Sequence, residues 1–292
     1  SSGSTAVTEA GGTDTYTVVL NAEPASDVVI DVSSDDTGEA TVDQSSLTFT
    51  SANWDTPQTV TVTGVDDDII DGTQTATITM SIDAASTDDD FDLVADQTVS
   101  ADNTDDDVAG FTIAESSGST AVTEAGGTDT YTVVLDAEPA SDVVIDVTSD
   151  DTGEATVDQS SLTFTSANWN TPQTVTVTGV DDDIIDGTQT ATITMSIDAA
   201  STDDDFDLVA DQTVSADNTD DDVAGFTIAE SSGSTAVTEA GATDSYTVVL
   251  DAEPASDVVI NVTSDDTGEA TVDQSSLTFT SADWDTPQTV TV

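Results

Sequence analysis

Runs of aspartate are the residues of this sequence whose type and spacing could do chemistry. Three aspartates occupy positions 181–183 with Asp186 close behind, and a second triplet occupies positions 220–222. Glu124 and Glu154 lie upstream of both runs. Carboxylate oxygens suit Ca²⁺, which takes roughly six to eight oxygen ligands at about 2.3–2.6 Å. If these side chains converge on one point, they form a calcium site.

The charge balance excludes most other partners. The 292 residues include 61 Asp and Glu but no Lys, Arg or His, which gives a formal net charge of −61. Nucleic acid and anionic membrane surfaces both attract proteins through cationic side chains, which this sequence lacks. We therefore expect cations as partners, with no nucleic acid and no direct membrane insertion.

Most catalytic groups are also missing from the sequence. Without His, Cys, Lys or Arg there is no Ser–His pair, no thiolate, no Schiff-base lysine and no zinc site with nitrogen or sulfur ligands. Paired carboxylates could still hydrolyse glycosides, but three Trp offer little material for a sugar-binding cleft. We therefore expect a protein that is not an enzyme.

An internal repeat divides the chain. The segment SSGSTAVTEA begins at Ser1, Ser116 and Ser231, a spacing of 115 residues, and AGFTIAE precedes its second and third occurrences. This spacing is the size of one domain. We expect three domains: residues 1–107, which lack the first strand, residues 108–222, which are complete, and residues 223–292, which lack the last strands. The near-identity of the copies favours length and repetition over a single active centre.

Apolar residues alternate with threonine through the middle unit, and Tyr131, Val133 and Leu135 share one face at a period of two. Turn signals such as Asp-Gly and Glu-Pro separate the runs. The pattern predicts an all-β fold, with tandem immunoglobulin-like β-sandwich domains of about seven antiparallel strands each in an elongated array. The expected strands are Phe111–Ile113, Thr130–Leu135, Asp142–Val147, Ser161–Thr165, Gln173–Thr178, Gln189–Ile197 and Gln212–Ala216.

These strands place the acidic runs at strand ends. Alternating strand directions return every second connection to the same end of a sandwich, so the runs can meet at one pole. Like charges within about one Debye length, roughly 8–10 Å, repel unless a cation holds them. Two other interpretations remain open: acidity that serves only solubility in a saline habitat, and an acidic coil without fixed structure. The first leaves the triplets at strand ends unexplained, and the second leaves the alternation unexplained.

The order of these motifs resembles the Calx-β domain. DDD-x-A-G-F-x-I, V-T-E, S-L-T-F, V-D-D-D-I-I-D and a second DDD follow one another along the unit. The resemblance implies calcium ligands from the early glutamate, from the acidic loop, where an isoleucine would offer its carbonyl oxygen, and from the terminal triplet. Glu39 and Glu154 stand where the family has an aspartate, and Asp71 and Asp186 stand where it has a glutamate. The implied ligands are Glu9, Glu39, Asp66, Asp67, Asp68, Ile69, Asp71, Asp105, Asp106 and Asp107 in the first repeat, and Glu124, Glu154, Asp181, Asp182, Asp183, Ile184, Asp186, Asp220, Asp221 and Asp222 in the second.

The leading functional hypothesis is structural. We expect an extracellular or cell-surface repeat protein whose Ca²⁺-bound domain junctions rigidify an adhesin stalk, a matrix protein or a surface filament. Its partners would be Ca²⁺, the adjacent repeats and, in a filament, other copies of the chain. The alternative is a regulatory calcium-sensing module of a membrane or enzyme-associated protein, which predicts divergent copies with graded affinity.

Overall fold

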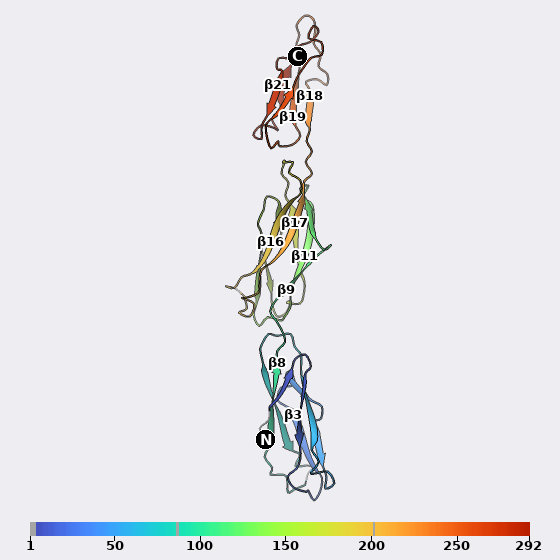
Figure 1. The fold of residues 1–292 in the computed structure, drawn as a ribbon, viewed down its shortest axis with the longest axis vertical. Helices are drawn as coiled ribbons and strands as arrows, with labels where there is room; N and C mark the ends of the chain where they lie inside the picture. Colours follow the sequence, from blue (N-terminus) through green and yellow to red (C-terminus); the bar gives the residue numbers. More distant parts are fainter. Residues whose placement is uncertain (1–3, 86–87, 201) are drawn as a thin grey trace.

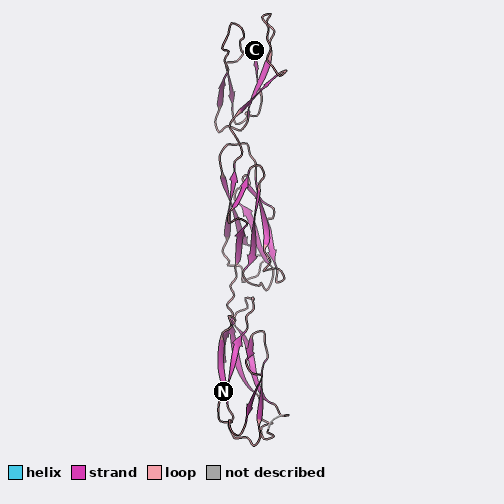
Figure 2. Ribbon diagram, turned by 90° about the vertical axis from the view of Figure 1, so that its right-hand side faces the viewer, coloured by secondary structure: helices cyan, strands magenta, loops and turns pink. Residues whose placement is uncertain are grey.

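The computed structural model describes residues 4–85, 88–200 and 202–292, which form strands joined by turns (Figure 1, Figure 2). Three groups of strands lie end to end along one long axis, in the order of the sequence repeats. The described residues include no helix, and so none that could cross a membrane. The elongated all-β array agrees with the prediction.

The described residues of the middle repeat form nine strands. They are β9 (Phe111–Glu115), β10 (Thr120–Thr123), β11 (Thr128–Leu135), β12 (Val143–Ser149), β13 (Ala155–Val157), β14 (Ser161–Phe164), β15 (Gln173–Gly179), β16 (Gln189–Ile197) and β17 (Gln212–Thr219). One sheet has the order β10-β17-β16-β12-β14, and the other has the order β13-β15-β11-β9. The two sheets enclose one apolar core, which confirms the predicted sandwich.

The sequence pattern missed two of these strands and one strand direction. β10 and β13 have four and three residues, too few to display a period of two. The expectation of purely antiparallel strands was wrong for β10, which pairs in parallel with β17, so that Val122 lies opposite Asn218. β10 and β17 therefore end at the same pole of the repeat. This parallel pair positions the acidic residues described below.

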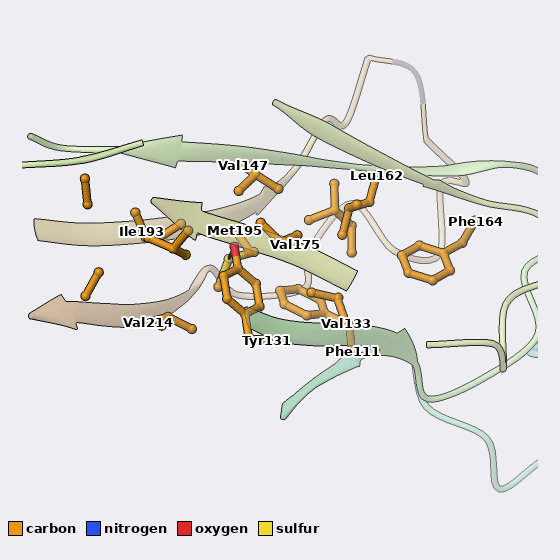
Figure 3. Packing of buried hydrophobic residues seen from close by; sticks show 14 of the residues in the cluster. Phe111, Tyr131, Val133, Val147, Leu162, Phe164, Val175, Ile193, Met195 and Val214 are labelled. Carbon is orange, nitrogen blue, oxygen red and sulfur yellow. Dashed lines mark hydrogen bonds between the residues drawn. The ribbon is translucent and has the colours of Figure 1, made fainter. Parts of the chain in front are cut away.

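The core of the middle repeat follows the alternation in the strands. Tyr131 and Val133 from one sheet meet Ile193 and Met195 from the other, and all four side chains are fully buried (Figure 3). Phe164 closes one end of the same cluster. The alternate positions of β15 and β16 hold threonines, which are less buried. Their β-branched side chains suit the outer face of a strand and add no charge.

The first repeat has the same architecture without a counterpart of β9. Its sheets have the orders β1-β8-β7-β3-β5 and β2-β6-β4. The strands are β1 (Ser4–Thr8), β2 (Thr13–Val18), β3 (Val28–Ser34), β4 (Ala40–Val42), β5 (Ser46–Phe49), β6 (Gln58–Gly64), β7 (Gln74–Ile82) and β8 (Gln97–Thr104).

The third repeat has fewer strands and a smaller core. They are β18 (Phe226–Glu230), β19 (Ser245–Leu250), β20 (Val258–Asn261), β21 (Ser276–Phe279) and β22 (Gln288–Thr291). β18, β19 and β22 form one sheet, and β20 pairs with β21. All five residues of β18 are exposed.

Truncating the core should destabilise the middle repeat selectively. The Phe164→Ala variant leaves a cavity where a fully buried ring stood, and we expect it to lower the free energy of unfolding by about 3–5 kcal/mol. Leu208→Ala is the control, because Leu208 is 96% exposed and its loss should change stability by less than about 0.5 kcal/mol. Urea unfolding followed by hydrogen exchange would measure both, and equal effects would contradict the assigned core.

Candidate metal centre

A buried glutamate lies at the pole of the middle repeat where β10 and β17 end. Glu124 directly follows β10 and is 1% exposed. Carboxylate oxygens of Glu124, Asp220 and Asp222 lie within 4.8 Å of one another. Two ligands on one Ca²⁺, each about 2.3–2.6 Å from the ion, are separated by up to about 5 Å. The spacing of the three carboxylates therefore fits a shared cation.

The first repeat contains the same cluster. Glu9 follows β1, and its carboxylate lies within 4.8 Å of oxygens from Asp105 and Asp107. Glu9 is fully buried, and neither of its carboxylate oxygens has a hydrogen-bond partner among the described residues. One buried oxygen of Asp107, and its counterpart in Asp222, is likewise unpartnered within the described part of the chain. Buried carboxylates are normally paired or bound to metal, so these oxygens fit a cation.

A single aspartate fastens the two acidic segments to each other. The N–H groups of Asp186 and Gly187 donate to Asp220 Oδ2 at 3.0 and 2.8 Å, and Asp222 N–H donates to Asp220 Oδ1 at 2.7 Å. Gly187 has a φ of 77°, which glycine adopts without strain. The bonds from Gly187 and Asp222 hold the pKa of Asp220 below its ordinary value. Asp105 makes the equivalent bonds in the first repeat.

A second acidic group lies at the same pole. Carboxylate oxygens of Glu154, Asp182 and Asp186 lie within 4.8 Å of one another, although all three residues are more exposed than Glu124. The structure thus brings Glu154 together with Asp182 and Asp186 of the acidic loop. In the first repeat, Glu39 lies beside Asn103.

Two asparagines that the sequence analysis did not single out position these glutamates. Asn218 is fully buried, and its Nδ2 donates to Glu154 Oε2 at 3.1 Å and to the Val180 carbonyl at 3.0 Å. Asn103 does the same with Glu39 and Val65. The signal was present in the sequence, because each asparagine continues the inward-facing positions of its strand. A polar residue at a core position just before an aspartate triplet points to a positioning role.

The remaining predicted ligands surround these clusters. Besides burial, the charges of Asp105, Asp67 and Asp71 raise the pKa of Glu9, so they lie near it. The pKa of Asp107 is raised, after burial, by charges that include those of Asp66, Asp68 and Asp106. The pKa of Asp222 is raised in the same way by burial and by charges that include those of Asp181, Asp183 and Asp221. Ile69 and Ile184 donate their N–H groups to Asp67 and Asp182 at 2.8 and 2.7 Å.

The electrostatics of the cluster favour bound positive charge. Burial, and secondarily the charge of Asp105, raise the pKa of Glu9 to about 7. Burial also raises the pKa of Glu124 to about 7, although a hydrogen bond from Asp221 N–H opposes it. Burial and the neighbouring aspartates raise the pKa values of Asp107 and Asp222. Each site therefore holds buried carboxylates with few hydrogen-bond donors among the described residues.

A buried aspartate elsewhere in the first repeat provides the contrast. Asp88 is 6% exposed, but Ser26 N–H donates to its Oδ2 at 2.7 Å and Asp90 N–H donates to its Oδ1 at 3.1 Å. The bond from Ser26, followed by that from Asp90, lowers its pKa. Asp203 has the same bonds in the second repeat. Asp88 and Asp203 are thus buried with backbone donors, whereas Glu9 is buried with none among the described residues.

The acidic loops also contact the following repeat. Glu138 N–H donates to the Asp68 carbonyl at 2.7 Å, and Glu253 N–H donates to the Asp183 carbonyl at 2.7 Å. Ile69 and Ile184 form parallel bridges with the same two glutamates. Ile70 packs against the core of the second repeat. Each loop thus contributes to a carboxylate cluster and to a junction.

Comparisons with known proteins add little to this geometry. No family model and no curated protein matches the chain. Among solved structures, the chain is similar to the calcium binding domain CBD12 of CALX1.1, with 14% identity, 66% of this chain and 77% of that chain covered, and a TM-score of 0.29. It is also similar to domains 4 and 5 of the S-layer protein SbsC, with 20% identity, 65% and 70% covered, and a TM-score of 0.32. For the apo-form Calx CBD1 domain the identity is 15%, the coverage is 38% and 98%, and the TM-score is 0.29. We therefore base the site on the chain's own residues.

Without metal, stability should fall as the pH rises. The pKa values of Glu9 and Glu124 are about 7 in the folded chain against an ordinary value of 4.5. Their protonation stabilises the fold fully below about pH 4.5, and this contribution is lost as the pH rises through about 7. In the presence of a chelator, we expect the free energy of unfolding to decrease by about 2 kcal/mol per glutamate between pH 5 and pH 8.

The double variant Glu9→Gln/Glu124→Gln is the control for this titration. It removes both titrating groups, so its unfolding midpoint in urea should depend less on pH across the same window. A wild-type chain that gains stability from pH 5 to pH 8 in the chelator would contradict the assignment.

Proposed function

We propose that this chain is an extracellular structural repeat protein of the Calx-β type that binds Ca²⁺ at the ends of its repeats. The repeats would comprise residues 1–107, 108–222 and 223–292, with cation sites at the two junctions. The observation that carries the proposal is the double role of the acidic loops. Asp68 and Asp183 supply backbone carbonyls to the next repeat, while their neighbours in the loop surround the buried glutamates.

The innermost ligands would be Glu9, Asp105 and Asp107 in the first repeat and Glu124, Asp220 and Asp222 in the second. A bound Ca²⁺ would neutralise their charge and would be coordinated by the oxygens that have no protein donor. Glu154, Asp182 and Asp186, with Glu39, Asp67 and Asp71 as their counterparts, would provide a second, more exposed position. The other loop and triplet residues, including the isoleucine carbonyls, would complete the shell with water.

An ion at this place would stiffen the junction. Asp105 and Asp220 already bind the acidic loop to the segment that leads into the next repeat. Holding the carboxylates of both segments on one ion would fix the loop that contacts Glu138 or Glu253. Without the ion, repulsion among the carboxylates would spread these segments apart. The chain would be a rod in calcium and a looser string without it.

The near-identity of the repeats favours this structural role over calcium sensing. Extracellular calcium modules bind at about 10⁻⁴–10⁻³ M, a range that suits a stalk, a matrix protein or a filament outside the cell. A sensor would need copies with different affinities. The two candidate sites instead have the same residues in the same places.

Calcium binding should depend on the buried glutamates. In calorimetric titration, we expect the Glu9→Gln/Glu124→Gln variant to bind Ca²⁺ at least about tenfold more weakly than the wild type, because a charged ligand is lost at each site. The matched control is Asp55→Asn/Asp96→Asn, which removes the same charge from exposed positions of the first repeat that precede β6 and β8, at the strand ends opposite the acidic loop and the triplet. Equal affinities for all three proteins would contradict the proposal.

Chelation should also change the shape of the chain in solution. Small-angle scattering is expected to show a rigid, extended particle in calcium and a broader distribution of sizes after EGTA, since the junctions loosen. The Glu9→Gln/Glu124→Gln variant should resemble the chelated wild type under both conditions. A wild-type profile that EGTA leaves unchanged would rule out stiffening by calcium while leaving binding itself open to calorimetry.

A further inference from the structure

The parallel pair of β10 and β17 joins the beginning of the second repeat to its end. Residues 111–123 form β9, which pairs with β11 in one sheet, and β10, which pairs with β17 in the other. β17 is the last strand of the repeat. The stretch by which the chain enters this repeat is therefore paired directly with the stretch by which it leaves.

The chain enters and leaves the repeat at opposite poles. β11 begins with Thr128 opposite Thr178 and ends with Leu135 opposite Phe111, so β9 begins at the pole far from the acidic cluster. β17 ends at the cluster. Because the repeats lie end to end along one axis (Figure 1), tension on the chain pulls β10 toward the preceding repeat and β17 toward the following one.

Tension in this direction loads the β10–β17 pair in shear. The two strands are parallel, and their hydrogen bonds are spaced evenly along them. Sliding one strand along the other therefore strains all of these bonds together. Opening a strand pair from one end would instead break the bonds one after another. The same bonds resist more force in the first geometry than in the second.

β10 is the more weakly held of the two strands. It is the outermost strand of its sheet and pairs with β17 over four residues. β17 also pairs with β16, from Gln212 opposite Met195 to Asn218 opposite Gln189. Under tension, the sheet should therefore separate between β10 and β17.

The acidic cluster continues the β10–β17 pair beyond its last residues. Glu124, which follows β10, donates its N–H to the Thr219 carbonyl at 3.1 Å. Its carboxylate then lies within 4.8 Å of oxygens from Asp220 and Asp222, which follow β17. A cation held by these three carboxylates would join the ends of the two loaded strands. β10 could slide along β17 only after Glu124 had left the ion.

The first repeat has the same arrangement. β1 pairs in parallel with β8, and Thr8 lies opposite Thr104 at the end of the pair. Glu9 N–H donates to the Thr104 carbonyl at 3.1 Å, and the Glu9 carboxylate lies in one cluster with Asp105 and Asp107. The combination of a parallel pair and an acidic cluster at its end is thus a property of the repeat.

We propose that each repeat bears tension along the chain, that the parallel pair of its entering and leaving strands is the force-bearing element, and that a cation between the strand ends cross-links this pair. The cross-link rests on the calcium binding proposed above, whereas the resistance of the strand pair does not. This inference concerns the unfolding of one repeat under load, which is a different property from the bending stiffness of a junction.

Single-molecule pulling on the whole chain tests the direction of resistance. The sequence contains no cysteine, so two introduced cysteines define the points of attachment. Val108→Cys/Val223→Cys loads the second repeat along the chain, at residues that are 74% and 75% exposed. Val108→Cys/Leu208→Cys is the matched control, because Leu208 is 96% exposed and precedes β17 at the same pole as Val108. At equal force in calcium, we expect the first pair to unfold at least about tenfold more slowly.

The same two attachment pairs test the cross-link. For the pair at positions 108 and 223, EGTA should raise the unfolding rate at a given force by about tenfold or more, because the charged contact between the strand ends is lost. The control pair should change far less. Adding Glu124→Gln should reproduce the effect of EGTA. Asp204→Asn removes the same charge from an exposed position before β17, at the opposite pole, and should leave the rate unchanged.

The outcomes separate this proposal from calcium binding itself. Equal unfolding rates for the two attachment pairs, in calcium and in EGTA alike, would overturn the force-bearing role, whatever calorimetry shows for binding. A directional difference that EGTA and Glu124→Gln leave unchanged would support the parallel pair and overturn the cross-link. A directional difference that both of them reduce would support the whole proposal.

Discussion

Buried carboxylates with few donors are the constraint on which the rest of this structure depends. A chain with 61 acidic residues and no basic ones has no cationic side chain with which to pair them. Most of the acids remain near water, but Glu9 and Glu124 are buried against further aspartates. Removing such charges from water is costly unless a proton or a cation accompanies them. The raised pKa values of both glutamates express that cost.

The topology places these buried carboxylates together at one pole of the repeat. β10 and β17 run in parallel and end together, so Glu124 and the 220–222 triplet emerge side by side. The end of β15 approaches them closely: a Cβ on Gly179 would lie 2.5 Å from Asn218 Oδ1 and would also meet the Thr123 carbonyl. Glycine at this position lets the acidic loop that follows β15 reach the cluster. The same loop then reaches the next repeat through Asp183 and Glu253.

Much of this arrangement could be predicted from sequence. The alternation of apolar residues with threonine predicted most of the strands, and the acidic runs at strand ends predicted a shared pole. Local patterns could not show that β10 pairs in parallel, because the partner lies about a hundred residues away. Local patterns also could not show which part of the next repeat each acidic loop contacts, because that contact depends on how whole domains meet. The two loops contact the turns after β11 and β19, and not the first strand of the next repeat.

The asparagines show a further limit of sequence reasoning. Asn103 and Asn218 occupy core positions in their strands, and their function is clear only once the glutamates lie beside them. The first and second repeats are almost identical in sequence, yet Tyr16 and Tyr131 differ in burial and hydrogen bonding. That difference follows from β9, which pairs with β11 beside Tyr131 and has no counterpart among the described residues of the first repeat, as the repeat pattern predicted.

Diffraction from crystals grown in calcium would test the central claim most directly. At calcium concentrations well above about 10⁻³ M, the account predicts anomalous peaks with oxygens of Glu124, Asp220 and Asp222 at about 2.3–2.6 Å, and equivalent peaks beside Glu9, Asp105 and Asp107. Clear density for these side chains with no anomalous peak, or with the glutamates hydrogen-bonded to neighbouring carboxyl groups, would contradict it.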